Sequence, residues 1–332
     1  MIKLLWGTDP HFKDLNPVSR IDNWAETLLD KFRQIGDLSR KHQVDAVILG
    51  GDIFDISTPS LTSHALVQRL IEEFKDIFTC PVYSNVGNHD VKYQQLRFLD
   101  QMPLGTLFSS GVFQRCYNEH EASFLDFEDD QVVRIVGVPY HGVRYDYRYF
   151  EKIKRRGKEK IICLAHVLAS PTGGKMFEGE DIISYKTLPD ICPEADVITF
   201  GHWHKNQGIQ QLPSGQWVVN IGSLSRGSLC EDNIDRIPSV ALIKVGKEIE
   251  IEEIPLKIKP ANEVFDLEKR EREEERSAIV SSFIEKLSLM RDKDAKKKSV
   301  EERMRRSEIP SEVRVKANEI WQTVLNSKGR VR

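Results

Sequence analysis

Short apolar runs alternate with amphipathic stretches along the first 255 residues. The apolar runs predict nine β-strands, because each is short and is followed by residues that favour turns. The predicted strands cover residues 2–7, 46–50, 82–86, 132–136, 160–165, 196–200, 217–221, 240–245 and 248–254. Strands that alternate with helical patterns are typical of a layered α/β domain.

Two amphipathic helices are predicted between the early strands. Apolar residues recur at helical spacing from Trp24 to Leu38 and again from Val67 to Ile77, and core packing against a sheet accounts for both stripes. The later strands follow one another across short turns, at 213–215 and at Gly246. Such spacing predicts antiparallel hairpins.

The sequence becomes strongly charged after about Pro260. Two apolar stripes at helical spacing follow, one from Ile279 to Met290 and one from Val313 to Leu325. We therefore expect two parts, a layered domain over 1–255 and a charged helical extension over 256–332. The two stripes either pack on each other or on the main domain, or they form a docking region for a partner helix, and the pattern leaves both open.

Composition narrows the class of protein. The chain has 332 residues, of which 40% are hydrophobic, enough for a large core. The N-terminal apolar run is too short for a signal peptide or a membrane span. Five widely spaced cysteines, none in a C-x-x-C pair, argue against a disulfide framework or a thiolate metal site. These features favour a reducing cytoplasm and no membrane partner.

Charge is distributed unevenly. The net charge is −3, but residues 1–255 carry 28 Lys and Arg against 36 Asp and Glu, whereas residues 256–332 carry 20 against 15. The overall charge therefore gives no nucleic-acid signature. One local stretch, residues 141–160, interleaves aromatic residues with eight Lys and Arg. This stretch could bind phosphate groups and stack on nucleic-acid bases. We favour the interpretation that it is a solvated basic surface.

Five polar motifs each follow a predicted strand. They are Asp9-Pro-His11, Gly51-Asp52-Ile-Phe-Asp55, Gly87-Asn88-His89-Asp90, His166, and Gly201-His202-Trp-His204. Loops beyond the carboxyl ends of strands gather at one edge of an α/β sheet, so these side chains are expected to converge there. The neighbouring glycines permit the tight turns that such convergence needs.

The chemistry of the motifs indicates a metal site. Taken singly, D-x-H could be a surface turn and His166 a core histidine, but a specified tetrapeptide such as Gly-Asn-His-Asp arises by chance only about once in 10⁵ positions. Carboxylate, imidazole and amide oxygen together suit hard or borderline divalent cations. Asp52, central in the set, is the natural bridge. Two cations about 3.5–4 Å apart clamp the oxygens of an in-line phosphoryl displacement, so hydrolysis of a phosphate ester is expected.

The ordered set DPH, GDIFD, GNHD, H and GHWH resembles the calcineurin-like metallophosphoesterase pattern, over roughly residues 1–225. The resemblance implies a four-layer α-β-β-α sandwich of two mixed sheets, here with a C-terminal helical appendage. It also implies two divalent ions, with manganese expected and iron, zinc or nickel compatible. The implied ligands are Asp9, His11, Asp52 and His204 for one ion, and Asp52, Asn88, His166 and His202 for the other.

The same resemblance implies catalytic roles for two residues that are not ligands. His89 would face the substrate and protonate the leaving oxygen or stabilise charge on phosphorus, which is a usual role for imidazole. Asp90 would orient His89.

Within that superfamily, GDIFDISTPS together with GNHD resembles the SbcD nuclease family, and Asp55 in place of histidine favours its bacterial or phage branch. This implies DNA as the substrate, an SbcC-like coiled-coil ATPase docking on the C-terminal helices, and a possible homodimer. The β-rich cap of that family has no evident counterpart after Pro260. A phosphodiesterase or phosphatase acting on a nucleotide or another small phosphoester is therefore the alternative. A non-catalytic scaffold is disfavoured by the complete ligand set.

Overall fold

The computed structural model describes residues 1–55, 62–126, 130–175, 179–268 and 315. Residues Met1–Phe265 form one compact unit, and Asp266–Arg332 form a second. The two apolar stripes predicted between Ile279 and Leu325 lie outside the described residues. The sheets and helices of the fold therefore belong to the first unit.

One large sheet contains six strands in the order β15-β14-β1-β2-β3-β4. Its strands are β1 (Ile2–Gly7), β2 (Ala46–Leu49), β3 (Val82–Ser84), β4 (Gln114–Arg115), β14 (Ser239–Val245) and β15 (Ile249–Pro255). Strands β1 to β4 run parallel to one another. Strand β14 pairs antiparallel with β1, and β15 pairs antiparallel with β14, so the sheet is mixed.

The second large sheet also contains six strands, in the order β12-β13-β11-β7-β6-β5. They are β5 (Ala122–Asp126), β6 (Gln131–Val138), β7 (Glu159–His166), β11 (Val197–Gly201), β12 (Gly208–Gln211) and β13 (Trp217–Asn220). The four central strands are parallel, and β5 and β12 pair antiparallel at the edges. A small third sheet joins β8 (Ala169–Ser170), β10 (Asp181–Ser184) and β9 (Gly174–Lys175).

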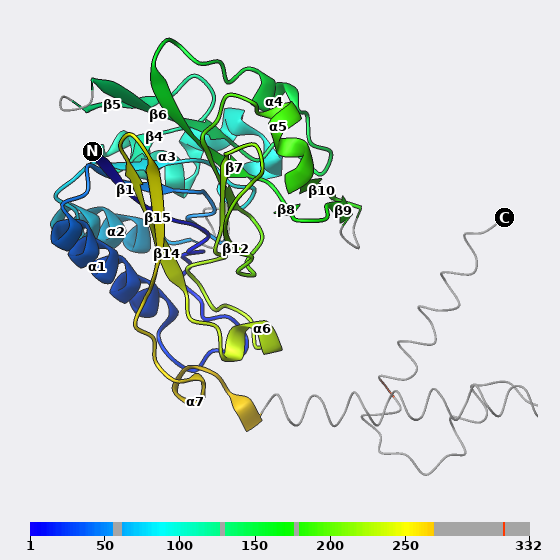
Figure 1. Ribbon diagram of the computed structural model, residues 1–332. Helices are drawn as coiled ribbons and strands as arrows, with labels where there is room; N and C mark the ends of the chain where they lie inside the picture. The colour runs from blue at the N-terminus through cyan, green and yellow to red at the C-terminus, as the bar shows by residue number, and fades with distance from the viewer. Residues whose placement is uncertain (56–61, 127–129, 176–178, 269–314, 316–332) are drawn as a thin grey trace, which may run out of the picture. The chain divides into compact units, whose positions relative to one another are not determined.

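The two large sheets pack face to face, and helices cover their outer faces (Figure 1). Along β1, Leu4 and Trp6 enter the core shared by the sheets, whereas Leu5 faces the core under α1 (Trp24–His42) and α2 (His64–Ile77). This alternation follows from the two-residue period of a strand. On the other side, α4 (Arg148–Glu151) and α5 (Leu188–Ile191) pack over the second sheet. The predicted α-β-β-α sandwich of two mixed sheets is confirmed.

Shorter helices complete the connections. They are α3 (Pro103–Ser109), α6 (Glu231–Ile234) and α7 (Ala261–Val264), with 3₁₀ turns at Lys92–Gln94, Leu96–Gln101 and Tyr185–Thr187. Within the described residues, no helix combines the length and apolar composition that crossing a membrane requires.

All nine predicted strands are present, with ends that shift by a few residues. The predicted hairpin at Gly246 is antiparallel. The turn at 213–215 also closes an antiparallel hairpin, but with β12, which was not predicted, whereas the predicted strands 196–200 and 217–221 pair parallel. The sequence patterns missed β4, β5, β12 and the small sheet. The reason is local: β4 is a two-residue pair of polar side chains, and β12, with the sequence GIQQ, carries one apolar residue. Such strands form only because a neighbouring strand offers hydrogen bonds.

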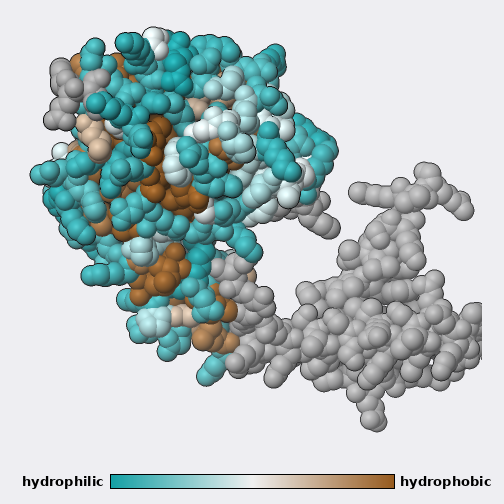
Figure 2. Space-filling view, viewed as in Figure 1, coloured by the Kyte–Doolittle hydropathy of each residue, from teal (hydrophilic) through white to brown (hydrophobic). Residues whose placement is uncertain are grey.

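The edge strand β15 alternates half-buried isoleucines with exposed glutamates. Figure 2 shows the corresponding face as mostly hydrophilic, with an apolar band over the β14–β15 hairpin. Charged side chains on an edge strand disfavour pairing with a second chain. This edge is therefore protected against sheet extension.

The contact between α1 and α2 depends on Gly36. A Cβ at this position would lie 2.6 Å from the Ile77 Cγ2 atom and 2.7 Å from the Ile77 carbonyl oxygen. We expect Gly36→Ala to lower the free energy of unfolding by about 1–3 kcal/mol, because overpacking outweighs the better helix propensity of alanine. Thermal unfolding of the full chain measures the effect. Asp37→Ala, at an exposed neighbouring site, is the control, and an unchanged melting temperature for Gly36→Ala would refute the packing argument.

Candidate metal centre

The predicted metal-binding motifs meet at one edge of the sandwich. Three follow the parallel strands β1, β2 and β3 of the first sheet, and two follow the parallel strands β7 and β11 of the second. The carboxyl ends of these strands point the same way, so the loops that follow them in both sheets meet along the line where the two sheets adjoin. We call this line the seam. The structure therefore brings together residues that are up to 195 positions apart, from Asp9 to His204.

The first cluster contains Asp9, His11 and His204, whose candidate ligand atoms all lie within 4.8 Å of one another. The Nε2 atoms of His11 and His204 are 2.9 Å apart, and the His11 Nε2 atom is 4.0 Å from Asp9 Oδ1. Two imidazole nitrogens and a carboxylate oxygen that face one point form a donor set suited to a borderline divalent cation.

The second cluster contains Asp52, His166 and His202, again within 4.8 Å. The His166 Nδ1 atom donates to the Gly50 carbonyl at 2.9 Å, which leaves Nε2 as its free ring nitrogen, 3.3 Å from Asp52 Oδ2. The same Asp52 oxygen is 3.7 Å from His11 Nε2. One buried carboxylate oxygen thus faces both clusters, the geometry that a bridging ligand needs.

Three buried polar atoms at the seam test whether cations fit. Asp52 Oδ2, Asn88 Oδ1 and His166 Nε2 are all inaccessible to solvent and have no hydrogen-bond partner among the described residues. Buried polar atoms are normally satisfied, so a group of unsatisfied ones requires an explanation. Two carboxamide or carboxylate oxygens and an imidazole nitrogen are metal donors, and the residues present fit a dinuclear centre.

Backbone conformation at the site is unusual. Asp9, His11, Asp52 and His202 all have positive φ, between 50° and 82°. Left-handed conformations in residues other than glycine cost of order 1–3 kcal/mol each and persist where the surroundings enforce them. Here hydrogen bonds do so: the Asp9 amide donates to the Gly51 carbonyl and the His11 amide to the Asp52 carbonyl, each at 3.1 Å.

The charges of the buried carboxylates and imidazoles are strongly coupled. Burial alone would raise the pKa of Asp52, but the facing His166 ring holds that pKa far below its usual range. Burial would lower the pKa of His166, and the charge of Asp52 outweighs it and raises the pKa to about 9. Burial and repulsion by Asp52 raise the pKa of Asp90 to about 7. The buried carboxylates at the seam therefore favour positive charge on the groups that they face.

The contacts of Asp90 differ from those expected. Its carboxylate accepts hydrogen bonds from the Gly87 and Phe54 amides, at 3.0 and 3.1 Å, and not from the His89 ring. The His89 Nδ1 atom instead lies 2.6 Å from the Asp55 carbonyl oxygen. In this structure Asp90 closes the GNHD turn, and the hydrogen-bond partner of the His89 ring is the Asp55 backbone carbonyl. The reason is that a short carboxylate satisfies the nearest amides first.

Two further residues at the site were not predicted from the sequence. Glu180 Oε1 lies 3.1 Å from His202 Nε2 and accepts a hydrogen bond from the Tyr145 hydroxyl at 2.7 Å. The Tyr140 ring packs 5.2 Å from the His202 ring. A carboxylate that fixes the orientation of an imidazole is a common partner of metal-binding histidines. Neither residue belongs to a recognisable motif, so no sequence signal distinguishes them from surface residues.

The basic stretch at 141–160 is largely paired with acidic groups. Arg144, Arg148, Arg155, Arg156 and Lys160 each lie within ion-pair distance of a carboxylate. The stretch includes only one short helix, Arg148–Glu151. Arginines engaged with Asp and Glu offer less free charge to a polyanion, which agrees with the interpretation of this stretch as a solvated surface.

Comparison with known proteins identifies the family. A sequence model of calcineurin-like phosphoesterases matches residues 2–206, so the chain belongs to the calcineurin-like phosphoesterase family. The expected class, a metal-dependent phosphoester hydrolase with a dinuclear metal centre, is the class that this family defines.

Two relatives show which members of the family this chain resembles in sequence. The DNA double-strand break repair protein Mre11 of Methanosarcina acetivorans is 26% identical over 216 residues, which cover 64% of this chain and 32% of that protein. The double-strand break repair protein mus-23 of Neurospora crassa is 24% identical over 301 residues, 77% of this chain and 39% of that protein. The chain thus spans about a third of the length of these relatives.

A solved structure supports the fold. The putative 5'-nucleotidase of Staphylococcus aureus superposes with a TM-score of 0.50 at 15% identity, covering 78% of this chain and 55% of that one. At this level of identity the likeness concerns the fold alone.

Close backbone approach at Gly87 is required for the cluster. A Cβ there would lie 2.0 Å from Asp52 Oδ1 and 2.6 Å from the Asp52 amide nitrogen. We expect Gly87→Ala to displace the Asp52 carboxylate and to reduce bound metal at least tenfold, because the shared oxygen would no longer face both clusters. Metal content after dialysis, measured by plasma mass spectrometry, is the test. Gly227→Ala, where a Cβ has 3.5 Å of room, is the control; full metal content in Gly87→Ala would contradict the assignment.

Proposed function

We propose that this protein is a manganese-dependent DNA nuclease subunit of the SbcD type, which acts in the cytoplasm in DNA repair or recombination. The observation that carries the proposal is the convergence of seven candidate ligands and one additional histidine at a single seam. The break-repair proteins among its relatives support DNA over other phosphoesters.

The proposed ligands divide between two ions. Asp9, His11 and His204 would hold the first, and Asn88, His166 and His202 the second, while the Asp52 oxygen that faces both clusters would bridge them. When bound, two divalent cations supply Lewis-acid polarisation of the phosphoester. The protein contributes fixed donor positions, because backbone hydrogen bonds hold the ligand loops.

His89 is the proposed catalytic residue. Its Nδ1 atom faces a carbonyl oxygen, which can only accept, so Nδ1 carries a hydrogen and Nε2 is the atom free to exchange a proton. The side chain is 40% exposed, whereas the candidate ligands Asp52 and His166 are buried. An accessible imidazole beside the cluster is suited to protonate a leaving alkoxide.

The proposed partner is an SbcC-like coiled-coil ATPase, with the C-terminal extension as the docking region, and the active assembly is proposed to contain two copies of this chain. Support comes from the sequence resemblance and from the two apolar stripes after residue 277. A nuclease that works with an ATPase would gain access to DNA ends through the motor, whereas a small phosphoester needs no such assistance.

A comparison of substrates tests the proposal. The purified full chain with manganese is assayed on linear double-stranded and single-stranded DNA beside bis-p-nitrophenyl phosphate, with and without the ATPase. We expect degradation of DNA in addition to hydrolysis of the small ester. Hydrolysis of the small ester with intact DNA under both conditions would overturn the nuclease assignment in favour of a small-phosphoester hydrolase.

His89→Ser tests the catalytic assignment. We expect turnover of bis-p-nitrophenyl phosphate to fall by about 10²–10⁴-fold, because general acid catalysis contributes about that factor, with metal content unchanged. His120→Ser alters an exposed histidine that packs on Tyr117 and serves as the control. Loss of metal in His89→Ser would show instead that His89 is a ligand.

A further inference from the structure

A basic cavity lies apart from the metal centre. It has a volume of about 380 Å³ and is formed by α1, by the loop at Arg226 and by residues 257–259 after β15. Lysine and arginine provide six of its twelve lining residues, and none of the twelve is a candidate metal ligand. The volume falls within the range of about 300–1,000 Å³ that is typical of small-molecule sites.

Three cations form the buried part of the cavity. Arg20, Lys31 and Arg226 are 6%, 3% and 3% exposed. Asp22 pairs with Arg20, but among the described residues neither Lys31 nor Arg226 has a carboxylate within ion-pair distance. They donate to carbonyl oxygens instead: Lys31 to Leu224, and Arg226 to Ile234 and Lys259. The carbonyl groups satisfy the hydrogen-bond donors of Lys31 and Arg226, but they do not neutralise the positive charges of these side chains.

The positive charges act on one another. Burial, followed by the charges of Arg236 and Arg20, lowers the pKa of Lys31 well below its usual value. Burial and the charge of Arg20 also lower the pKa of Arg226. Concentrating buried cations without an equal number of anions is costly unless a further negative group compensates them. A bound anion would supply that compensation.

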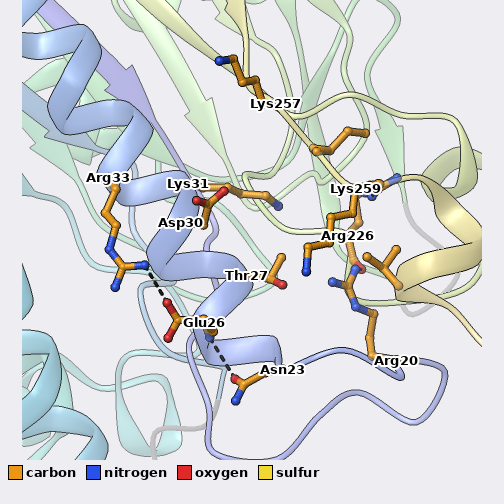
Figure 3. Close-up of a pocket in the computed structure, with 12 residues that line it drawn as sticks. Arg20, Asn23, Glu26, Thr27, Asp30, Lys31, Arg33, Arg226, Lys257 and Lys259 are labelled. Carbon is orange, nitrogen blue, oxygen red and sulfur yellow. Dashed lines mark hydrogen bonds and ion pairs between the residues drawn. The ribbon is translucent and has the colours of Figure 1, made fainter.

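Two exposed lysines complete the cavity. Lys257 and Lys259 line it from the segment after β15, and within the described part of the chain no acidic partner lies within ion-pair distance of either ammonium group. Figure 3 shows Lys31 extending from α1 toward Lys259 and Arg226, which lie on two different segments, whereas the Lys257 side chain points away from them. Unlike the buried cations, these two ammonium groups do not stabilise the fold.

The walls of the cavity are held in place. The Gln34 side chain accepts a hydrogen bond from the Lys257 amide at 2.7 Å and donates to the Lys257 carbonyl at 3.0 Å. Arg226 donates to the Lys259 carbonyl at 2.8 Å. Two carboxylates line the α1 side: Glu26 pairs with Arg33 and Arg69, and Asp30 accepts a hydrogen bond from the Gln34 side chain. The lysines and arginines still outnumber them. The cavity is therefore preformed and positively charged.

We propose that this cavity is a second, non-catalytic site for a phosphate-bearing ligand, with the phosphate group bound among Lys31, Arg226 and Lys259, and with Lys257 at the edge of the cavity. Phosphate suits the site because ammonium and guanidinium groups form charge-assisted hydrogen bonds with its oxygens. The lining offers no aromatic ring for stacking. Recognition therefore depends on the phosphate, whether it is inorganic or the end of a nucleotide.

Charge reversal at the two exposed lysines tests the site. The manganese-loaded full chain is equilibrated by dialysis with radiolabelled inorganic phosphate, and the double variant Lys257→Glu, Lys259→Glu is compared with Lys75→Glu. Lys75 is an exposed lysine on α2, outside the cavity. We expect one class of phosphate site to weaken by at least about tenfold, close to 1.4 kcal/mol, in the double variant only. Manganese content and turnover of bis-p-nitrophenyl phosphate should be equal in all three proteins.

Competition identifies the source of the phosphate. Displacement of the label by unlabelled pyrophosphate alone would assign an inorganic phosphate, and displacement by thymidine monophosphate at lower concentration would assign a nucleotide. Phosphate binding that is the same in the wild type and the double variant would overturn the proposal. Equal weakening in Lys75→Glu would also overturn it, because the effect would then come from overall charge. Both outcomes are independent of whether the metal centre cleaves DNA.

Discussion

The site depends on a buried carboxylate, Asp52, held between imidazoles contributed by different sheets. Its Oδ2 atom faces His11 and His166, and its Oδ1 atom accepts the His89 amide at 2.8 Å. A charge this deeply buried is tolerated only when opposite charges and hydrogen bonds surround it. The left-handed backbone at Asp52 and the close approach of Gly87 follow from that requirement. The packing, the backbone strain and the electrostatics at the seam therefore depend on one another.

The two-sheet architecture supplies the rigidity that this arrangement needs. Each candidate ligand loop begins where a buried parallel strand ends, and the strands are fixed by the apolar core between the sheets. The supporting contacts reach beyond the seam. Ser223 donates to the Asp9 carbonyl at 2.9 Å, and Trp24 of α1 donates to the His11 carbonyl at 3.0 Å. The backbone that presents the donors is thus bonded to the layers that surround it.

The same loop that supports Asp9 also borders the basic cavity. Leu224 donates its amide to the Thr8 carbonyl, and its own carbonyl accepts from Lys31. The molecule therefore carries two regions of opposite charge on either side of one short loop: a carboxylate-rich seam suited to cations and a cavity rich in lysine and arginine. Such a separation allows a metal centre and an anion site to be occupied together, because the ligands of one do not compete for those of the other.

The sequence by itself determined the nine main strands, the two long helices, the family and the residues at the seam. Those features are local: apolar periodicity and short motifs such as GNHD record them directly. Only the tertiary structure decided the contacts of Asp90 and Asp55, the position of Glu180 beside His202, and the edge strands. It also brought the cations of the basic cavity together from positions 20 to 259. These features depend on which distant groups meet in space, and no local pattern in the chain records that meeting.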